Sequence, residues 1–443
     1  MKVAVIGAGV SGLATAYALK SENHRVIVYE KSEQIGGTWV FDPEVESDPL
    51  GIDPSREVVH GSLYQSLRTN IPRQLMGFFD CPFFARRYGE SSIFPSHEEV
   101  LEFLNEFASE FRLVELIQFE TEVVRVERVD LRNDQWVVES KMNELSSNEI
   151  FDAVVVCSGH HTQPRVADFP GMEKWPGKQM HSHNYRVPEP FQDQVIRFSF
   201  RYFSSFSIVV VIGDGPSAKD ISLEISKVAK EVRLSSRSPN VKVSRLDFAN
   251  NMWQHSKIDY VDEKGEVKFE DGASVHADII LHCTGYKYDF PFLKTGGIVT
   301  VDDNRVGPLY KHIFPPKIAP TLSFVGLPYN SGVVFLMIDL QAKWIAHVLS
   351  GKRNLPSEGN MLSEVEEYYR KMDEKRIPKH HTHSLVHKNI PTSQLDYLDW
   401  LASEVGLAGV DEQTRFIQKC YLKYVIDNGG WRNREWEFNN GIQ

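Results

Sequence analysis

A glycine-rich turn near the start of the chain has the residue types and spacing of a pyrophosphate-binding loop. Residues 2–6 form a short apolar run, the turn 7–12 has glycine at its first, third and sixth positions, and residues 13–20 have a helical pattern. Glycine at those positions permits a tight turn, close approach of the backbone to a pyrophosphate, and close packing of helix on strand. The helix that follows directs its first N–H groups at the anion. The residues expected to hold it are Gly7, Ala8, Gly9, Val10, Ser11 and Gly12.

An acidic residue completes this unit. Glu30 follows a second apolar run, 26–29, and stands 18 residues after Gly12. A carboxylate in that position accepts hydrogen bonds from ribose hydroxyls. Strand, turn, helix, strand and acid in this order predict a dinucleotide site.

The same unit recurs in the middle of the chain with a different ending. An apolar run at 208–212 leads into a second glycine-rich turn, a helical pattern over 219–230 and a short strand at 231–234. Serine and arginine then replace the acid, which suits a 2′-phosphate that a carboxylate would repel. We therefore expect FAD at the first unit and NADPH at the second, although an arginine here can also be an ordinary solvated residue. The residues expected at the NADP site are Gly213, Asp214, Gly215, Pro216, Ser217, Ala218, Ser236 and Arg237.

Composition excludes several classes of protein. The 443 residues carry 49 basic and 60 acidic side chains, a net charge of -11, which argues against a nucleic-acid partner. No apolar run is long enough for a membrane span. The first predicted strand begins at residue 2, so we expect no signal peptide and a cytoplasmic protein. The cysteines are far apart in sequence, which argues against a disulfide reductase and predicts reduced, mostly buried thiols. They are Cys81, Cys157, Cys283 and Cys420.

The remaining pattern predicts how the domains are arranged. Apolar runs at 151–156 and 277–281 each end near a glycine, as strands that return the chain to a cofactor do, and 121–126 and 135–140 read as a small antiparallel sheet. We predict an α/β fold with two Rossmann-like dinucleotide-binding domains of the three-layer ββα type. The expected division is an FAD domain in two parts, an NADPH domain inserted between them, and a helical C-terminal segment. The first part of the FAD domain is 1–175, and the NADPH domain is 176–288. Residues 289–443 hold the second part of the FAD domain with its helical C-terminal extension.

Further motifs give the chain a family resemblance. They are GGTW at 36–39, a segment at 175–185 similar to the fingerprint FxGxxxHxxxY, CTGY at 283–286, and GLP at 326–328 followed by LQAKW at 340–344. With the two turns, this set resembles the class B flavin-containing monooxygenases over nearly the whole chain up to about residue 350. Residues 62–83 are most similar to the plant branch that oxygenates thioethers such as methylthioalkyl glucosinolates or S-alkenyl cysteines.

The resemblance implies an activity and a set of site residues. In the family, NADPH reduces FAD, O2 adds at flavin C4a as a hydroperoxide, and a soft nucleophile takes the distal oxygen, so a thioether becomes a sulfoxide. Asn70 matches the family asparagine near the flavin and is the expected catalytic residue, although RTN at 68–70 can also be a simple turn. Gln341 is expected to contact the flavin ring, and His181 to stabilise the domain linker. The other implied FAD contacts are Lys31, Gly37, Thr38, Trp39, Thr69 and Val124.

Departures from the family pattern leave alternatives open. The fingerprint begins with Trp175 and ends with Tyr185, which argues against Baeyer–Villiger monooxygenases. Residues 196–207 read as an insertion without helical period, either a genuine surface loop or an artefact of the gene model, and peptide mapping would decide. The alternatives are an N-oxygenating or oxidatively decarboxylating enzyme of auxin biosynthesis, or a nucleotide-binding protein inactivated by the insertion. A monomer and a homodimer both remain open.

Two side-chain clusters invite a functional interpretation that we do not favour. The first is a group of four histidines between residues 380 and 387. Their spacing matches no standard metal site, so we expect no bound metal and a solvated loop. The second is a group of four phenylalanines between residues 78 and 84. They could line a substrate channel, but we expect them to lie in the buried core. The clusters are His380, His381, His383 and His387, and Phe78, Phe79, Phe83 and Phe84.

Overall fold

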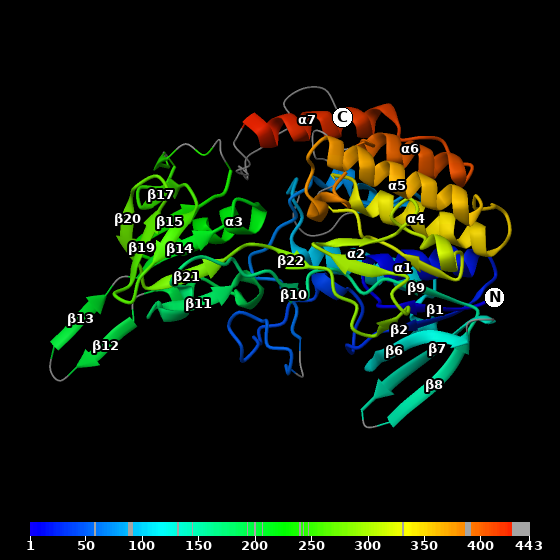
Figure 1. Cartoon of the computed structure of the whole chain (residues 1–443), viewed down its shortest axis with the longest axis horizontal. Coiled ribbons are helices and arrows are strands. Elements are labelled where there is room, and N and C mark those ends of the chain that lie inside the picture. The colour runs from blue at the N-terminus through cyan, green and yellow to red at the C-terminus, as the bar shows by residue number, and fades with distance from the viewer. Residues whose placement is uncertain are drawn as a thin grey trace.

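The protein has two lobes, as the computed structural model shows (Figure 1). The structure describes residues 1–427 with gaps at 57–58, 87–91, 131–132, 144, 193, 199–200, 206, 239–240, 242, 247, 330–331 and 386–390. The first lobe combines early and late parts of the chain. The second lobe, green in Figure 1, comes from its middle.

A parallel five-stranded sheet forms the centre of the first lobe. Its order is β26 (Leu322–Phe324), β9 (Ala153–Val156), β1 (Lys2–Ile6), β2 (Arg25–Tyr29) and β5 (Ile117–Gln118). Helices α1 (Val10–Ser21), α4 (Val334–Leu349) and α2 (His97–Glu110) contribute to the apolar core on one face. Because β1 is covered on both faces, its sequence is a continuous apolar run without alternation.

A second sheet covers the other face of β1. Its order is β23 (Leu293–Lys294), β6 (Thr121–Asp130), β7 (Asn133–Met142) and β8 (Leu145–Phe151). Ala4 and Ile6 of β1 share a core with Val126, Trp136 and Phe151 of this sheet. The two strands expected here are present and longer than predicted, whereas β8 was missed because most of its residues are polar and exposed.

The second lobe repeats the plan of the first. Its six-stranded sheet has the order β11 (Lys178–His181), β21 (Ile279–His282), β14 (Ile208–Ile212), β15 (Glu231–Ser235), β17 (Met252–His255) and β16 (Ser244–Arg245). Helix α3 (Pro216–Ile225) packs on one face. On the other lies an antiparallel sheet of β18 (Ile258–Val261), β19 (Glu266–Phe269) and β20 (Ser274–His276). The predicted fold class of two Rossmann-type units is confirmed. Helix α3 is shorter than predicted and begins earlier, because Pro216 fits the first helical turn.

The inserted segment forms a hairpin, not the irregular loop that was expected. Strands β12 (Gln194–Phe198) and β13 (Arg201–Ser205) pair antiparallel and project from the second lobe (Figure 1). Strand β14, which follows, still pairs with β15 on one side and β21 on the other. The insertion therefore leaves the central sheet of this lobe intact.

Short elements connect the lobes, and three helices follow α4. Strands β10 (Gln163–Pro164) and β22 (Tyr286–Lys287) pair where the chain leaves and re-enters the first lobe. The other strands are β3 (Gly77–Phe78), β4 (Cys81–Pro82), β24 (Thr300–Asp302) and β25 (Arg305–Gly307). Helices α5 (Glu358–Glu374), α6 (Gln394–Glu404) and α7 (Glu412–Asp427) lie on the first lobe, and α7 extends toward the second (Figure 1). None of the described helices is long and apolar enough to cross a membrane.

Candidate active site

The first glycine turn is too crowded for side chains at two positions. A Cβ on Gly7 would lie 2.7 Å from the carbonyl oxygen of Cys157, and Gly7 has a φ of 103°. A Cβ on Gly12 would lie 1.8 Å from the carbonyl oxygen of Gly7. The turn therefore brings α1 against β1 more closely than any other residue type allows.

Both helices that follow the glycine turns begin without a side-chain cap. Helices α2, α5 and α6 start at Ser96, Ser357 and Ser393, whose hydroxyls accept backbone N–H bonds. Helices α1 and α3 start at Gly9 and Gly215, with no capping side chain in the described structure. Uncapped N–H groups and the positive end of the helix dipole favour a bound anion. The donors present thus fit the pyrophosphates of two dinucleotides.

Glu30 is held in place beside the first turn. Its buried carboxylate accepts from the backbone N–H of Ala8 at 2.7 Å and of Ser32 at 2.9 Å. A cavity of about 650 Å³ opens next to it, with Lys31 and Asp42 in its wall. Predicted contact Val124 lies at a bulge of β6, between Val123 and Arg125, and is half-exposed. This neighbourhood has the room and the acceptors for the adenosine half of FAD.

Residues 37–39 lie next to the first glycine turn. Gly37, Thr38 and Trp39 form a short 3-10 helix, and a Cβ on Gly37 would lie 3.1 Å from the Cα of Gly9. The two predicted contact segments are therefore adjacent in space although about 30 residues apart in sequence.

The second glycine turn is as crowded as the first at its first glycine, where a Cβ on Gly213 would lie 2.4 Å from the carbonyl oxygen of Cys283, but it is more open at its second glycine. A Cβ on Gly215 would meet nothing within 4 Å, and Asp214 pairs with Lys219 at 3.1 Å. Ser236 is buried and accepts from the backbone N–H of Ser238 at 3.1 Å, whereas Arg237 is exposed. An exposed guanidinium at the end of β15 is free to meet a phosphate that arrives from solvent.

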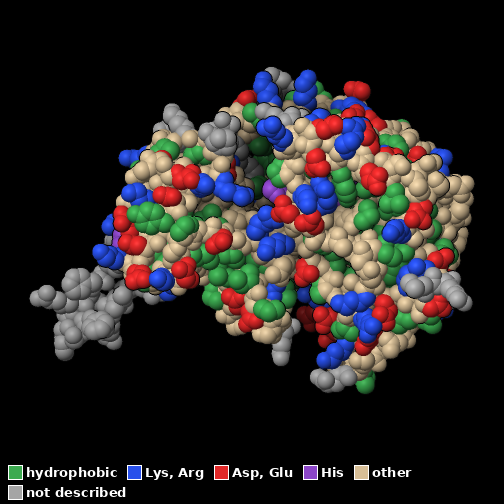
Figure 2. Space-filling model, in the orientation of Figure 1, with side chains coloured by type: hydrophobic (Ala, Val, Ile, Leu, Met, Phe, Trp, Pro, Cys, Tyr) green, Lys and Arg blue, Asp and Glu red, His purple; other side chains and the backbone are tan. Residues whose placement is uncertain are grey.

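Asn70 sits in a well-anchored turn with its own side chain exposed. Thr69 is buried and donates its N–H to the carbonyl of Pro95 at 2.9 Å, and its hydroxyl to the carbonyl of Ile71 at 2.8 Å. The hydroxyl of Tyr421 on α7 donates to the carbonyl of Asn70. Sequence reasoning missed Tyr421, because nothing in the sequence indicates that α7 reaches this turn. In the space-filling view, the surface is hollowed where the two lobes meet (Figure 2).

Gln341 is fully buried, and both ends of its amide have partners within the chain. Its oxygen accepts from the N–H of Gly326 at 3.0 Å, and its nitrogen donates to the hydroxyl of Tyr397 at 2.9 Å. A Cβ on Gly326 would lie 2.5 Å from the hydroxyl of Ser11 in the first turn. The described contacts thus join Gln341 to the first turn through Gly326, and its contact with the flavin ring stays a prediction.

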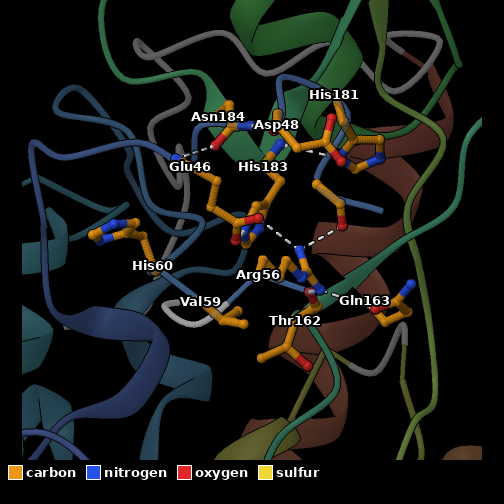
Figure 3. A network of polar contacts seen from close by, with 12 residues as sticks. Glu46, Asp48, Arg56, Val59, His60, Thr162, Gln163, His181, His183 and Asn184 are labelled. Atoms are coloured by element: carbon orange, nitrogen blue, oxygen red, sulfur yellow. Dashed lines mark hydrogen bonds and ion pairs between the residues drawn. The ribbon is translucent and has the colours of Figure 1, made fainter. Parts of the chain in front are cut away.

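A buried polar network joins the two lobes, and sequence analysis missed it (Figure 3). Glu46 accepts from His183 at 2.6 Å and from Arg56 at 2.7 Å, and both contacts are almost fully buried. Arg56 also donates to the carbonyl of Thr162 at 3.0 Å and to the side chain of Gln163 at 2.9 Å. The loop that carries Glu46 and Arg56 therefore binds the segment that leads into the second lobe and His183 of the fingerprint segment.

The fingerprint segment packs into this junction. His181 is buried, its Nδ1 accepts from the N–H of His183 at 3.0 Å, and burial lowers its pKa to about 3. A neutral, buried histidine between the lobes agrees with a role in the linker. Trp175 lies against Gly177, where a Cβ would be 2.2 Å from the indole, so the replacement for phenylalanine keeps a packing role.

Two expectations about side-chain clusters were partly wrong. His383 is buried, accepts from the N–H of Val306 at 3.1 Å and lies 3.2 Å from His312, so it belongs to a packed core and not to a solvated loop. His387 lies outside the described residues. Within the described part of the chain, no group of side chains could hold a metal ion.

The phenylalanines divide evenly between core and surface. Phe78 and Phe83 are buried as expected, but Phe79 is 42% exposed and Phe84 59% exposed. The cysteines match the expectation of free, mostly buried thiols, with Cys81, Cys157 and Cys283 buried and Cys420 partly so.

Comparison with known proteins assigns the family. The family model described as flavin-binding monooxygenase-like matches residues 1–254 and 249–411. The chain belongs to the flavin-binding monooxygenase family. It is 51% identical over 442 residues to the flavin-containing monooxygenase FMO GS-OX5 of Arabidopsis thaliana, covering 98% of this chain and 91% of that protein.

Solved structures agree with this assignment. The S-allyl-L-cysteine S-oxygenase of Allium sativum is 48% identical, with a TM-score of 0.89 over 96% of this chain and 93% of that one. Tmm from Pelagibacter sp. strain HTCC7211 is 25% identical, with a TM-score of 0.77 over 96% and 90% of the two chains. The chain is therefore a flavin-dependent monooxygenase.

Proposed function

We propose that this flavin-binding monooxygenase oxygenates the sulfur of a small thioether. In the balanced reaction, NADPH, a proton, O2 and the thioether give NADP+, water and the sulfoxide. One oxygen atom forms the new S–O bond, and the other leaves as water with the two electrons of NADPH.

One observation carries this choice of substrate. Relatives at about half identity match nearly the whole chain, and one of them is named as an S-allyl-L-cysteine S-oxygenase. These matches cover 96% and 98% of this chain, so the similarity extends beyond the nucleotide sites.

Residues of this chain would bind the two cofactors, orient the reacting oxygen and keep water away from it. The turn at 7–12, Glu30 and the 37–39 helix would hold FAD, and the turn at 213–218 with Ser236 and Arg237 would hold NADPH. We assign FAD to residues 1–175 and 289–443 and NADPH to residues 176–288. Bound FAD, once reduced by NADPH, supplies the activated oxygen that sulfur takes.

Asn70 would orient the reacting oxygen. An amide donates a hydrogen bond without giving up a proton, so it can hold an oxygen atom in place without protonating it. Its backbone is fixed on both sides, through Thr69 and Tyr421. The exposed amide is therefore presented by a rigid turn.

Product analysis tests the proposal. The holoenzyme with NADPH and O2 should convert S-allyl-cysteine to its sulfoxide, with one NADPH consumed per product. An amine or indole-3-pyruvate offered at the same concentration should react far more slowly. Preferred oxygenation of the amine, or decarboxylation of the 2-oxo acid, would overturn the assignment to sulfur.

An asparagine variant tests the site. Asn70→Ala should lower sulfoxide formation by about 100-fold, since loss of one preorganised donor costs 10²–10³ in other enzymes. Anaerobic bleaching of the flavin by NADPH should remain, because Asn70 is assigned to the oxygen step. Asn105→Ala, on the exposed side of α2, is the matched control and should leave product formation unchanged.

A further inference from the structure

The carboxylate of Glu224 connects α3 to the fingerprint segment and to the segment that precedes Asn70. Its Oε2 accepts from the hydroxyl of Tyr185 at 2.8 Å, and its Oε1 accepts from the hydroxyl of Ser66. Tyr185 ends the fingerprint segment, and Ser66 stands four residues before Asn70. Glu224 is only 9% exposed, so these two hydroxyls replace water that its carboxylate would otherwise bind.

Residues 64–66 are attached to the second lobe by further contacts. Tyr64 is part of the apolar core beneath α3, and its hydroxyl donates to Asp220 at 3.1 Å. Its ring packs edge-on against Tyr185, with ring centroids 5.7 Å apart. The backbone N–H of Gln65 donates to the carbonyl of Arg186 at 3.0 Å.

Residues 67–69 are attached to the first lobe. The N–H of His97 at the start of α2 donates to the carbonyl of Leu67 at 3.2 Å, and Arg68 forms a β-bridge with Ser96. Thr69 is bonded to Pro95, as described above. Residues 64–70, which we call the bridging segment, thus run from α3 in the second lobe to Asn70 in the first.

The helix that carries Glu224 also carries the proposed NADP site. Helix α3 begins at Pro216, beside the second glycine turn, and Glu224 lies eight residues later, about 12 Å along the axis at 1.5 Å per residue. Helix α3 lies on the side of the second lobe that faces the first (Figure 1). A helix is rigid over this length, so a nucleotide that orders its start also orders the carboxylate at its far end.

From these contacts we infer that Glu224 is a positioning residue that couples nucleotide binding at the second turn to the placement of Asn70. It acts through Ser66 and the bridging segment. The inference rests on the proposed NADP site and on the proposed role of Asn70. It gives the oxygen-transfer site a means of responding to whether the nucleotide is bound.

Hydrogen exchange on the FAD-loaded, full-length protein tests this coupling without measuring activity. Adding NADP+ should slow amide exchange in two places, at the second turn (213–218) and in the bridging segment. In Ser66→Ala, which removes one hydroxyl at an exposed position, protection of the second turn should persist. Protection of the bridging segment should fall by about tenfold, the effect of losing one hydrogen bond to a charged group.

Two further variants separate coupling from general stability. Glu224→Gln should behave as Ser66→Ala does, with loss of protection confined to the bridging segment. Glu270→Gln, which removes an exposed carboxylate of the same lobe that pairs with Lys257, should leave both protections at the wild-type level.

The outcomes separate the inference from the function on which it rests. If NADP+ protects neither region of the wild-type protein, the proposed NADP site fails, and the inference fails with it. If NADP+ protects the second turn but not the bridging segment, only the inference is overturned. Equal protection of the bridging segment in the wild type and in Ser66→Ala would also overturn it.

Discussion

The two glycine turns share a plan and are equally crowded at their first glycine, but they differ in how tightly the later positions are enclosed. In the first, a methyl group on Gly12 would collide with the carbonyl of Gly7 at 1.8 Å. In the second, Ala218 occupies the equivalent place, and its methyl lies 3.4 Å from where a Cβ on Gly213 would be. The acid that follows the first turn is buried and bonded to it, whereas the arginine that follows the second is exposed.

This difference would match the demands on the two cofactors if FAD binds at the first turn and NADPH at the second, as we propose. A flavin that stays bound through every turnover gains from a closed site, because each buried contact slows its release. A nicotinamide carrier that must leave after each turnover needs an open site. The four predictions below test this contrast, from the largest expected effect to the smallest.

Closing the first turn further should destroy the site. Gly12→Ala forces α1 away from β1, since the added methyl meets backbone and not a flexible side chain. We expect a loss of about 4 kcal/mol or more in the free energy of unfolding and protein without flavin. Urea unfolding and the visible absorption of bound flavin measure this. A yellow variant of normal stability would contradict the tight packing of the first turn.

Acid should weaken the lobe that contains the second turn. His282 pairs in the sheet with Ile212 at the end of β14; the equivalent pair in the first lobe is Val156 with Ile6. Burial lowers the pKa of His282 from 6.5 to about 4. Between these two values the unfolded chain binds the proton and the folded one does not, so stability falls as pH drops from 6.5 toward 4. The loss approaches roughly 3 kcal/mol for this group.

A variant isolates the contribution of His282 from that of other buried histidines. His282→Asn keeps an acceptor for the N–H of Ala167 but carries no titrating ring. Urea midpoints measured between pH 4 and pH 7 should fall less steeply for the variant than for the wild type. Identical slopes would show that His282 does not titrate on unfolding.

Removing the exposed arginine should change cofactor choice without changing the fold. Arg237→Ala should raise the KM for NADPH about tenfold or more and leave the KM for NADH as it is, because only NADPH carries the 2′-phosphate. Steady-state kinetics with both carriers measure this. Lys257→Ala, at another exposed site of the same lobe, is the control. An equal change for both carriers would remove Arg237 from the 2′-phosphate site.

Restoring glycine to the second turn should have the smallest effect. Ala218→Gly makes the two turns alike in sequence, but it removes only a methyl from the first turn of α3. We expect a loss of about 1–2 kcal/mol in unfolding free energy, from the helix cost of glycine relative to alanine and from the lost burial of one methyl. A gain in stability would show that this position favours glycine as Gly12 does, and that the two turns are packed alike.

Local patterns predicted the nucleotide units well because their physics is local. A buried parallel strand, a glycine turn and the start of a helix are contiguous in sequence, so residues 2–12 and 208–218 determine their own geometry. Strand β8 was missed because most of its residues are polar and exposed. The hairpin of the insertion was read as a loop because its two short strands depend on each other for pairing. His383 was misplaced for a similar reason, since its neighbours in sequence are polar and its burial comes from segments far along the chain.

The sequence by itself determined two dinucleotide folds, the acid in one and the arginine in the other, and the free state of the cysteines. Only the tertiary structure decided that α7 reaches the Asn70 turn, that Glu46 joins the lobes, and that Glu224 lies against Ser66. Each of these contacts joins residues between 137 and 351 positions apart. Whether such groups meet depends on how whole lobes pack, and no pattern of neighbouring residues encodes that.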